Sequence, residues 1–567
     1  MNRVAYLLSA MTFAPAAVAL GLAVVTSALR RVGRDLPEGM WRGIGLGTFL
    51  FTAMLAVWLW TAFDPASARQ FQFIEVVAWI PEWGLTYFVG VDGISLLLLL
   101  LTAAVFPLVY VASWDSVVHH VRTWVALLLL LETSLIGFFT ALDAVQFFVW
   151  LELGLLPLAL LVALWGGEGR MRAAAKLLGF QATASALLFV AFLVLHVLTA
   201  EQTGLRSFDL VPPPGATGSW LDTVLPVVDS RWWATQHAVF VALAAAFAIL
   251  TAVVPFHVWA TGAMREGPVG AASLIASVVV KIGAYGFLRC VLPLAPIAAV
   301  DAAGPMMALG AAALLYGALA SLGQRTAIGF LAHVSQAQLG WLLLGWFSFS
   351  VAGIEGGIVY MIHHGASLGA LFLLLGMLRQ RAGTDALAAF GGVAKPMPVY
   401  MALLGVLVLS TFPIPGAMGF AGSFLILLGA LPTGVGPAVV GSAAALLLAL
   451  GWAWNVRRIG FGPVSNPANR GLIDLGWRER IVILAFIVPI VGLGIHPETL
   501  TARLHQPVLK LRRVMLDRAI ASNEAAPHPL AARAIARLEE APDERAGGGA
   551  WWDGNTATRA PGSEDPP

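Results

Sequence analysis

Long apolar segments recur along the chain, and they constrain its fold more than any other feature. Segments such as Ile94–Trp114 and Thr123–Leu142 are long enough to cross about 30 Å of hydrocarbon at about 1.5 Å per helical residue. Only 11% of the residues are charged and 59% are hydrophobic, whereas soluble domains carry about 25% charged residues. The sequence therefore predicts an all-α polytopic membrane protein and excludes a soluble domain on one anchor.

We predict about fourteen spanning helices from these apolar segments. Their ranges are 5–28, 43–63, 91–113, 123–141, 143–164, 174–198, 236–256, 268–290, 303–321, 327–346, 352–379, 397–430, 434–456 and 480–497.

Two of the predicted spans contain helix-breaking residues. The twelfth is longer than one helix needs and contains Pro413, Pro415 and Gly416, so we expect a broken helix there. The seventh contains Pro255 and precedes the polar stretch His257–Pro268, which predicts a second interruption. Irregular backbone at membrane depth is tolerated only where protein or a wet cavity covers it.

The two interrupted spans are five spans apart, which suggests two five-helix repeats. Because five is odd, the second repeat has to be inverted relative to the first, as in membrane transporters with sites near the midplane. The predicted organisation is helices 1–3 in 1–113, a first repeat in 114–295, a second repeat in 296–460, helix 14 with an amphipathic end in 461–515, and a disordered tail in 516–567 with one short helix near 529–540.

Basic residues are concentrated in the loops that follow odd-numbered spans. Examples are Arg30, Arg31, Arg34, Arg42, Arg122, Arg170, Arg172, Lys176, Arg379, Arg381, Lys395, Arg457 and Arg458. Positively charged loops stay on the cytoplasmic side, so we expect a multi-pass protein of the cell inner membrane with a periplasmic N-terminus. Lys510, Arg512 and Arg513 follow the last span and leave the side of the tail open.

Three ionisable residues lie inside apolar segments: Glu132, Glu152 and Lys281. A charge at the bilayer centre costs roughly 2.5–3.5 kcal/mol, so such residues are functional candidates. A Glu and a Lys in one low-dielectric bundle can exchange a proton, because burial favours their neutral forms while mutual attraction favours their charged forms. The alternative is a structural ion pair that fixes helix packing.

Two histidines complete the candidate proton-carrying set. His257 lies next to the interrupted seventh span, and His364 lies within an apolar segment. Histidine titrates near neutral pH and can relay protons. For His257, a hydrogen-bonded core histidine is an equally good interpretation.

No other chemical motif stands out. The sequence has no glycine-rich nucleotide loop and no Cys/His metal spacing, and its single cysteine, Cys290, excludes an internal disulfide framework. The net charge of +2 does not point to a nucleic-acid partner. We therefore expect no metal, no cofactor and no redox chemistry in this chain.

Several motifs resemble the M subunit (chain 4) of respiratory complex I, an antiporter-like family. These are Val91–Ser95, Val149–Pro157, Leu164–Gly167, Val254–Trp259, Glu266–Pro268, Val280–Arg289, Gly391–Pro398 and Pro413–Phe424, within a likeness that runs from about residue 85 to 500. The resemblance implies fourteen helices, two inverted repeats and a midplane line of Glu, Lys and His residues. It also implies flanking antiporter-like subunits as partners in the bilayer. By position, Glu132, Glu152, Lys281 and His364 correspond to the proton-carrying residues of helices 4, 5, 8 and 11.

The chain departs from the family pattern at both broken helices. Leu250 replaces a lysine of helix 7, and Ser423 replaces a glutamate of helix 12. Gln338 takes the place of a histidine in helix 10, where Ile328 and Gly329 replace a Lys-Arg pair. We therefore hypothesise a divergent M-type subunit of a proton-translocating NADH:quinone oxidoreductase, with an impaired or rerouted proton path.

Two other functions stay open at this point. Cation/proton antiporters and inorganic-carbon uptake systems use the same fold with different partner proteins, and a purely structural scaffold would use the charges only for packing. Fold resemblance alone does not decide among them.

Overall fold

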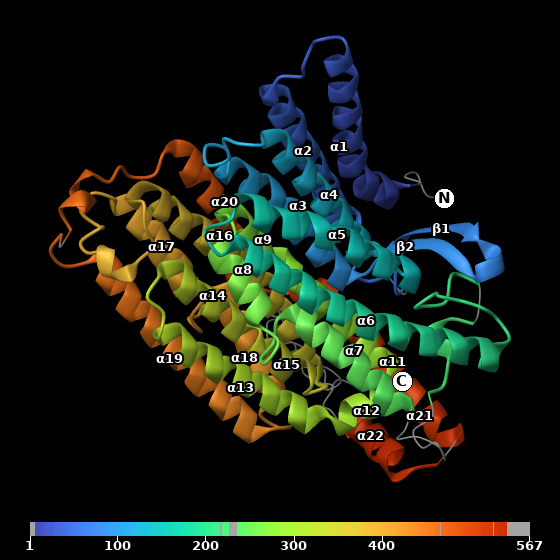
Figure 1. Cartoon of the computed structure of the whole chain (residues 1–567). Helices are drawn as coiled ribbons and strands as arrows, with labels where there is room; N and C mark the ends of the chain where they lie inside the picture. The colour runs from blue at the N-terminus through green and yellow to red at the C-terminus, as the bar shows by residue number, and fades with distance from the viewer. Residues whose placement is uncertain are drawn as a thin grey trace, which may run out of the picture.

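The computed structural model describes residues 6–67, 69–215, 218–225, 235–464, 466–525 and 527–540. These parts of the chain form a bundle of long helices with one small hairpin (Figure 1). The first half contains α1 (Leu7–Arg31), α2 (Glu38–Ala62), β1 (Gln72–Ile80), β2 (Leu85–Val91), α3 (Gly93–Ala112), α4 (Val121–Thr140), α5 (Ala144–Trp165), α6 (Arg170–Thr203), α7 (Thr235–Thr251), α8 (Val258–Glu266), α9 (Val269–Leu274), α10 (Val280–Gly286), α11 (Leu292–Leu294) and α12 (Pro296–Asp301).

The second half continues the bundle. It contains α13 (Ala303–Leu322), α14 (Ala327–Gln338), α15 (Gly340–Trp346), α16 (Val351–Ala382), α17 (Pro398–Ser410), α18 (Met418–Ala430), α19 (Val435–Gly460), α20 (Trp477–Ile495), α21 (Glu498–Ala525) and α22 (Pro529–Glu540).

The predicted fold class is confirmed. Eleven of the described helices, or up to twelve if the bent pair α20–α21 counts as one span, are long and apolar enough to cross a membrane. The remaining predicted spans correspond to the shorter α7, to the pair α17 and α18, and to α20. Both predicted interruptions are present, between α7 and α8 around Pro255 and between α17 and α18 around Pro413 and Gly416.

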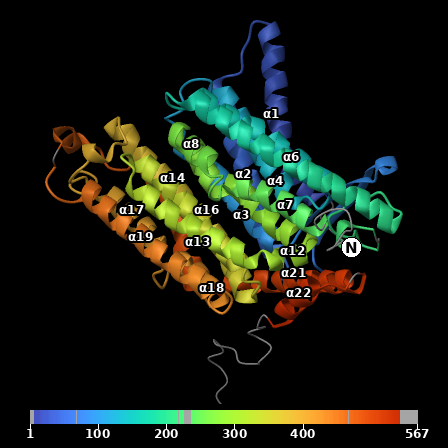
Figure 2. The same cartoon turned by 60° about the horizontal axis from the view of Figure 1, so that its bottom comes forward.

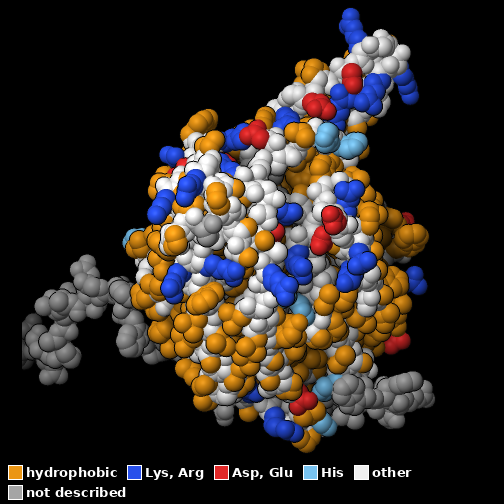
Figure 3. All heavy atoms as spheres, turned by 60° about the vertical axis from the view of Figure 1, so that its left-hand side comes forward, with side chains coloured by type: hydrophobic (Ala, Val, Ile, Leu, Met, Phe, Trp, Pro, Cys, Tyr) orange, Lys and Arg blue, Asp and Glu red, His pale blue; other side chains and the backbone are white. Residues whose placement is uncertain are grey.

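Basic loops gather at one end of the bundle. Arg122 of α4 forms an ion pair with Asp35 after α1, and Arg381 of α16 pairs with Glu479 at the start of α20. On the surface, Lys and Arg side chains cluster above a broad hydrophobic band (Figure 3). This separation of charge from a belt of apolar side chains is expected for a membrane-spanning bundle.

The opposite end carries an antiparallel hairpin that we did not predict. Strands β1 and β2 pair from Gln72↔Val91 to Ile80↔Leu85. Glu75 on β1 accepts hydrogen bonds from the Leu8 and Ser9 amides, so it satisfies free N–H groups at the start of α1. The hairpin is thereby attached to the first helix.

The chain end is ordered further than expected. We predicted a disordered tail from residue 516, but α21 runs to Ala525 and α22 occupies Pro529–Glu540, where we expected the short helix. Both helices lie across one end of the bundle (Figure 2). The disorder prediction is wrong for this part because leucines on one face of α21, such as Leu504 and Leu511, are buried against the bundle. Residues 541–567 lie outside the described residues.

Candidate functional site

The centre of the candidate site is a contact between helices α10 and α16. Lys281 and His364 are both fully buried, and Lys281 Nζ lies 2.5 Å from His364 Nδ1. On the other side of the ring, His364 Nε2 lies 2.9 Å from the Ser335 carbonyl oxygen. An N–H at Nε2 donating to this carbonyl leaves Nδ1 as the acceptor for the lysine. The geometry therefore suits a proton transfer from Lys281 to His364.

Lys281 is held by an irregular stretch of helix. A π-helical segment, Ile275–Val279, directly precedes α10, and a second one, Phe287–Val291, follows it. Within the first, the Ala276 carbonyl oxygen accepts a hydrogen bond from Lys281 Nζ at 2.5 Å. Single π-turns inside α-helices are frequent at functional sites, because they leave backbone groups free for other partners.

Glu152 lies apart from this pair. It projects from α5, is only half-buried, and accepts a hydrogen bond from the Ser185 hydroxyl of α6. No ion pair joins Glu152 to Lys281 within the described part of the chain. The structure thus separates the two residues that could have formed a structural ion pair in the sequence interpretation.

Glu132 on α4 is fully buried. One carboxylate oxygen accepts a hydrogen bond from Thr52 of α2 at 2.7 Å, and the other has no partner among the described residues. A buried carboxylate with one free oxygen is costly to keep charged. This arrangement is compatible with a carboxyl group that takes up a proton.

His257 and Leu250 lie on either side of the break between α7 and α8. His257 occupies the N-cap position of α8 without a side-chain capping hydrogen bond, and its ring centroid lies 5.0 Å from that of Tyr316 on α13. Leu250 is buried one residue before Thr251. A β-carbon on Gly283 of α10 would lie 2.3 Å from the Thr251 amide nitrogen, so α7 and α10 touch backbone to backbone. Leu250 therefore places a buried apolar side chain near the end of α7, at the position where the resemblance implies a lysine.

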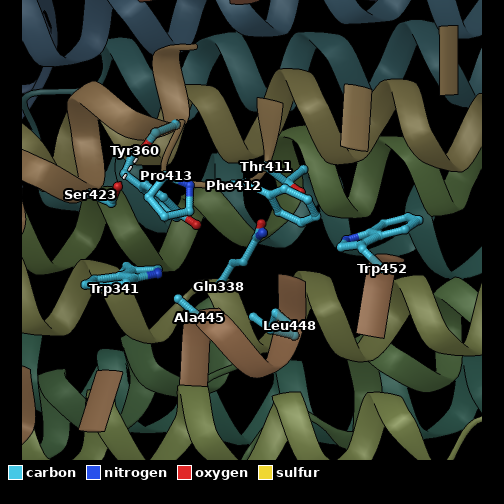
Figure 4. A pocket seen from close by; sticks show the side chains of 11 residues that line it. Gln338, Trp341, Tyr360, Thr411, Phe412, Pro413, Ser423, Ala445, Leu448 and Trp452 are labelled. Atoms are coloured by element: carbon cyan, nitrogen blue, oxygen red, sulfur yellow. Dashed lines mark hydrogen bonds between the residues drawn. The ribbon is translucent and has the colours of Figure 1, made fainter. Parts of the chain in front are cut away.

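The break between α17 and α18 opens onto a small cavity of about 20 Å³, enough for about one water molecule. Gln338 and Ser423 both line this cavity, together with Pro413 and Thr411 (Figure 4). Ser423 donates its hydroxyl proton to the Gly419 carbonyl oxygen at 2.8 Å, so its free lone pairs can accept from water. The Gln338 side-chain oxygen is buried without a partner among the described residues. Gln338 and Ser423 thus both line this cavity.

A second histidine, which we did not single out, connects to the same break. His363 Nδ1 lies 3.1 Å from the Ser367 hydroxyl, which lies 3.3 Å from the Ser410 hydroxyl at the end of α17. Its Nε2 atom faces Gly419 of the cavity wall, where a β-carbon would lie 2.6 Å from it. The sequence signal was the His-His pair in an apolar segment, but only the fold shows that its two rings point to different neighbours.

These groups do not form one continuous hydrogen-bonded line in the described structure. Lys281, His364 and Ser335 are joined directly, and Gln338 lies one turn beyond Ser335 on α14. A helical bundle with two interrupted helices and buried ionisable side chains near them has the architecture of membrane transporters.

Comparison with known proteins agrees with this class. The profile of the family described as NADH:quinone oxidoreductase/Mrp antiporter, TM, matches residues 141–448. NADH-quinone oxidoreductase subunit M of Rhodobacter capsulatus is 33% identical over 501 residues, which are 87% of this chain and 94% of the relative. NADH-ubiquinone oxidoreductase chain 4 of Marchantia polymorpha is 30% identical and covers 83% of this chain and 91% of the relative.

Solved structures give the same result. A chain of respiratory complex I from Thermus thermophilus superposes with a TM-score of 0.76 at 27% identity, over 90% of this chain and 99% of that chain. A chain of the Mrp complex from Dietzia has a TM-score of 0.71 at 21% identity, over 90% and 99%, which shows the fold alone. The chain belongs to the NADH:quinone oxidoreductase/Mrp antiporter transmembrane family.

Proposed function

We propose that this chain is the membrane-embedded, non-redox M-type subunit of a proton-translocating NADH:quinone oxidoreductase complex. Relatives named subunit M and chain 4 match it over most of their lengths. The observation that carries the proposal is the buried contact between Lys281 and His364 at 2.5 Å. Electron transfer takes place in other subunits, and flanking antiporter-like subunits cover the bundle in the inner membrane, with the basic loops on the cytoplasmic side.

The second half of the proton path is rerouted through water. A path that lacks the glutamate at position 423 needs another way past α18. His364 contacts Ser335, and Gln338 on the next turn of α14 lines the cavity that Ser423 also lines. A water molecule there can accept and donate protons nearly as well as a direct hydrogen-bonded group. A hydrated passage through this cavity thus takes the place of the glutamate at position 423.

Proton uptake by the purified complex in proteoliposomes tests this proposal. Gln338→Leu fills the cavity with an apolar side chain, and we expect translocation to fall several-fold while electron transfer continues. Ser442→Ala, on α19, removes a hydroxyl that bonds its own helix at 2.9 Å and serves as the control. Unchanged translocation in the Gln338 variant would show that protons do not pass this cavity.

Glu152→Gln tests the other interpretation, in which the path is impaired. If the first half of the path carries protons, this variant lowers translocation as strongly as the Gln338 variant does. If Glu152→Gln translocates protons as well as the unaltered complex does, this would instead support an impaired path, in which the subunit no longer carries protons through Glu152.

A cation antiporter or inorganic-carbon uptake component is the alternative. The likeness to the Mrp complex extends only to the fold at 21% identity, whereas the named relatives at 30–33% identity are subunit M proteins and chain 4. Purification in mild detergent with identification of the co-purifying subunits distinguishes the two, since quinone-site and iron–sulfur subunits accompany only the first.

A further inference from the structure

Two buried carboxylates face each other at the hairpin end of the bundle. Asp143 precedes α5, and Asp209 lies in the segment after α6; the two residues form an antiparallel bridge. The Ala144 amide donates to the Phe208 carbonyl oxygen at 2.8 Å, and the Leu210 amide donates to the Leu142 carbonyl oxygen at 2.9 Å. This pattern is that of a non-hydrogen-bonded pair, whose Cα atoms lie about 4.5 Å apart with both side chains on one face.

The surroundings of the pair provide hydrogen bonds, and no ion pair reaches it from the described residues. Asp143 is 1% exposed; its Oδ1 accepts from the Gln146 amide at 2.9 Å. Its Oδ2 is buried without a partner among the described residues. Asp209 is 7% exposed and accepts from the Thr86 hydroxyl of β2 at 2.5 Å and from the Ser207 hydroxyl at 3.1 Å. Within the described chain, no lysine, arginine or histidine forms an ion pair with either carboxylate.

Like charges directly opposite each other in a β-ladder are destabilising, and burial without a counter-ion increases that cost. The geometry points to one proton bound by the Asp143–Asp209 pair and carried on Asp143, whose Oδ2 has no partner among the described residues. This pair is a proton-holding site separate from the Lys281–His364 contact. Burial, with a contribution from Asp209, raises the pKa of Asp143 to about 8, and burial also raises the pKa of Asp209.

The position of the pair suggests what the proton does, and this step rests on the proposed function. Helix α5 leads from Asp143 to Glu152, nine residues or roughly 14 Å further along the helix axis. Helix α6 carries Ser185, the partner of Glu152, and leads to the segment of Asp209. Thr86 is half-buried at the surface of the hairpin. The pair therefore lies between the aqueous surface and Glu152, where it can hold a proton in transit.

Infrared spectroscopy of the assembled complex in lipid nanodiscs, titrated from about pH 5 to about pH 9, tests whether the aspartate pair binds this proton. The measurement does not require the complex to be transferring electrons. We expect a carboxylic-acid C=O band that disappears as the pH rises past about 8. The band is absent in Asp143→Asn, and in Asp209→Asn its midpoint moves to lower pH, because the like charge is gone. Asp64→Asn, an exposed carboxyl, leaves the band unchanged.

Three results would overturn the proposal: no such band near pH 6, the same midpoint in Asp209→Asn as in the unaltered complex, or a midpoint that falls when sodium replaces a bulky organic cation. The last would identify a cation site. Proton uptake by the same Asp143→Asn complex is measured separately. Full translocation by the Asp143→Asn complex would overturn the transit role alone. The translocation measured in the Lys281 and Gln338 variants bears only on the proposed function.

Discussion

At the scale of single residues, the site depends on where a few polar side chains point. Lys281 reaches back to the Ala276 carbonyl oxygen and sideways to His364, so its ammonium group has two acceptors and no counter-ion among the described residues. Glu152, by contrast, is only half-buried and bonded to a hydroxyl. The predicted site residues thus lie in two different environments, and the lysine–histidine pair is more completely buried than Glu152.

We predict that Lys281→Met lowers proton translocation by about tenfold or more, since losing a positioned proton-transfer group typically costs 10²–10⁴-fold in rate. Fluorescence quenching of a pH-sensitive dye in proteoliposomes measures it. Lys176→Met removes an exposed lysine near the start of α6 and is the matched control. Equal translocation in the two variants would remove Lys281 from the path.

Asp143 gives the protein a pH-dependent stability. Its pKa is raised from 3.8 to about 8 in the folded protein, so folding favours the protonated form. The stability that this group contributes is complete below pH 3.8 and is lost as the pH rises through about 8. We predict that the melting temperature falls between about pH 5 and about pH 8, and falls less in Asp143→Asn, whose amide oxygen can still cap α5. Thermal unfolding followed by tryptophan fluorescence measures the melting temperature at each pH. The same pH dependence of the melting temperature in the unaltered protein and in Asp143→Asn would contradict the prediction.

At the scale of elements, close helix contacts position the interrupted helices. Gly283 lets α10 approach α7 at Thr251, and Gly422 of α18 faces the Tyr360 backbone of α16, where a β-carbon would lie 2.7 Å from the amide nitrogen. Backbone atoms cannot move aside as a flexible side chain can. Small residues at these crossings therefore hold each broken helix against its unbroken neighbour.

Gly283→Ala should therefore destabilise the bundle by about 1–3 kcal/mol, the usual cost of overpacking a closely packed contact. Gly262→Ala on α8 has no atom within 4 Å of the new β-carbon and is the matched control, expected to be neutral or slightly stabilising. Melting temperatures of both variants in detergent measure the difference. A Gly283 variant as stable as the control would mean that α7 and α10 separate easily.

At the scale of the whole molecule, α21 ties distant parts of the bundle together. Arg518 is buried and donates hydrogen bonds to the carbonyl oxygens of Trp220, Leu221 and Leu294. His505 of the same helix lies 2.8 Å from the buried carboxylate of Glu355 on α16. Burial lowers the pKa of Arg518 to about 10. These contacts explain why the chain remains ordered beyond residue 516.

Removing the side chain in Arg518→Ala leaves three buried carbonyl groups without their donor. We predict a loss of about 2–3 kcal/mol in stability, since hydrogen bonds from charged donors contribute about 1.5–3 kcal/mol each and water can satisfy part of the loss. Faster proteolysis within α21 reports the release of the helix. Arg513→Ala, which removes an exposed ion pair with Asp517, should leave proteolysis unchanged; similar cleavage of both variants would show that Arg518 does not anchor the helix.

The sequence alone was sufficient for the helical membrane class, the two broken helices and the buried status of Glu132, Lys281 and His364. Apolar length, proline placement and charge cost act locally along the chain, so they can be read without coordinates. The inverted repeats inferred from the same spacing stay a prediction. The hairpin β1–β2 and the order of α21 beyond residue 515 were not predicted, because their stability comes from contacts with segments far away in sequence.

Tertiary structure alone decided which polar groups meet. Nothing in the sequence says that Lys281 contacts His364 and not Glu152, that Gln338 and Ser423 share one cavity, or that Asp143 opposes Asp209 across a two-segment bridge. Such partners lie far apart in the sequence: Lys281 and His364 are 83 residues apart, and Tyr285 and Phe139 are 146 residues apart. Hydropathy determines that a segment enters the membrane, whereas side-chain pairing depends on helix rotation and packing, which only the assembled bundle sets.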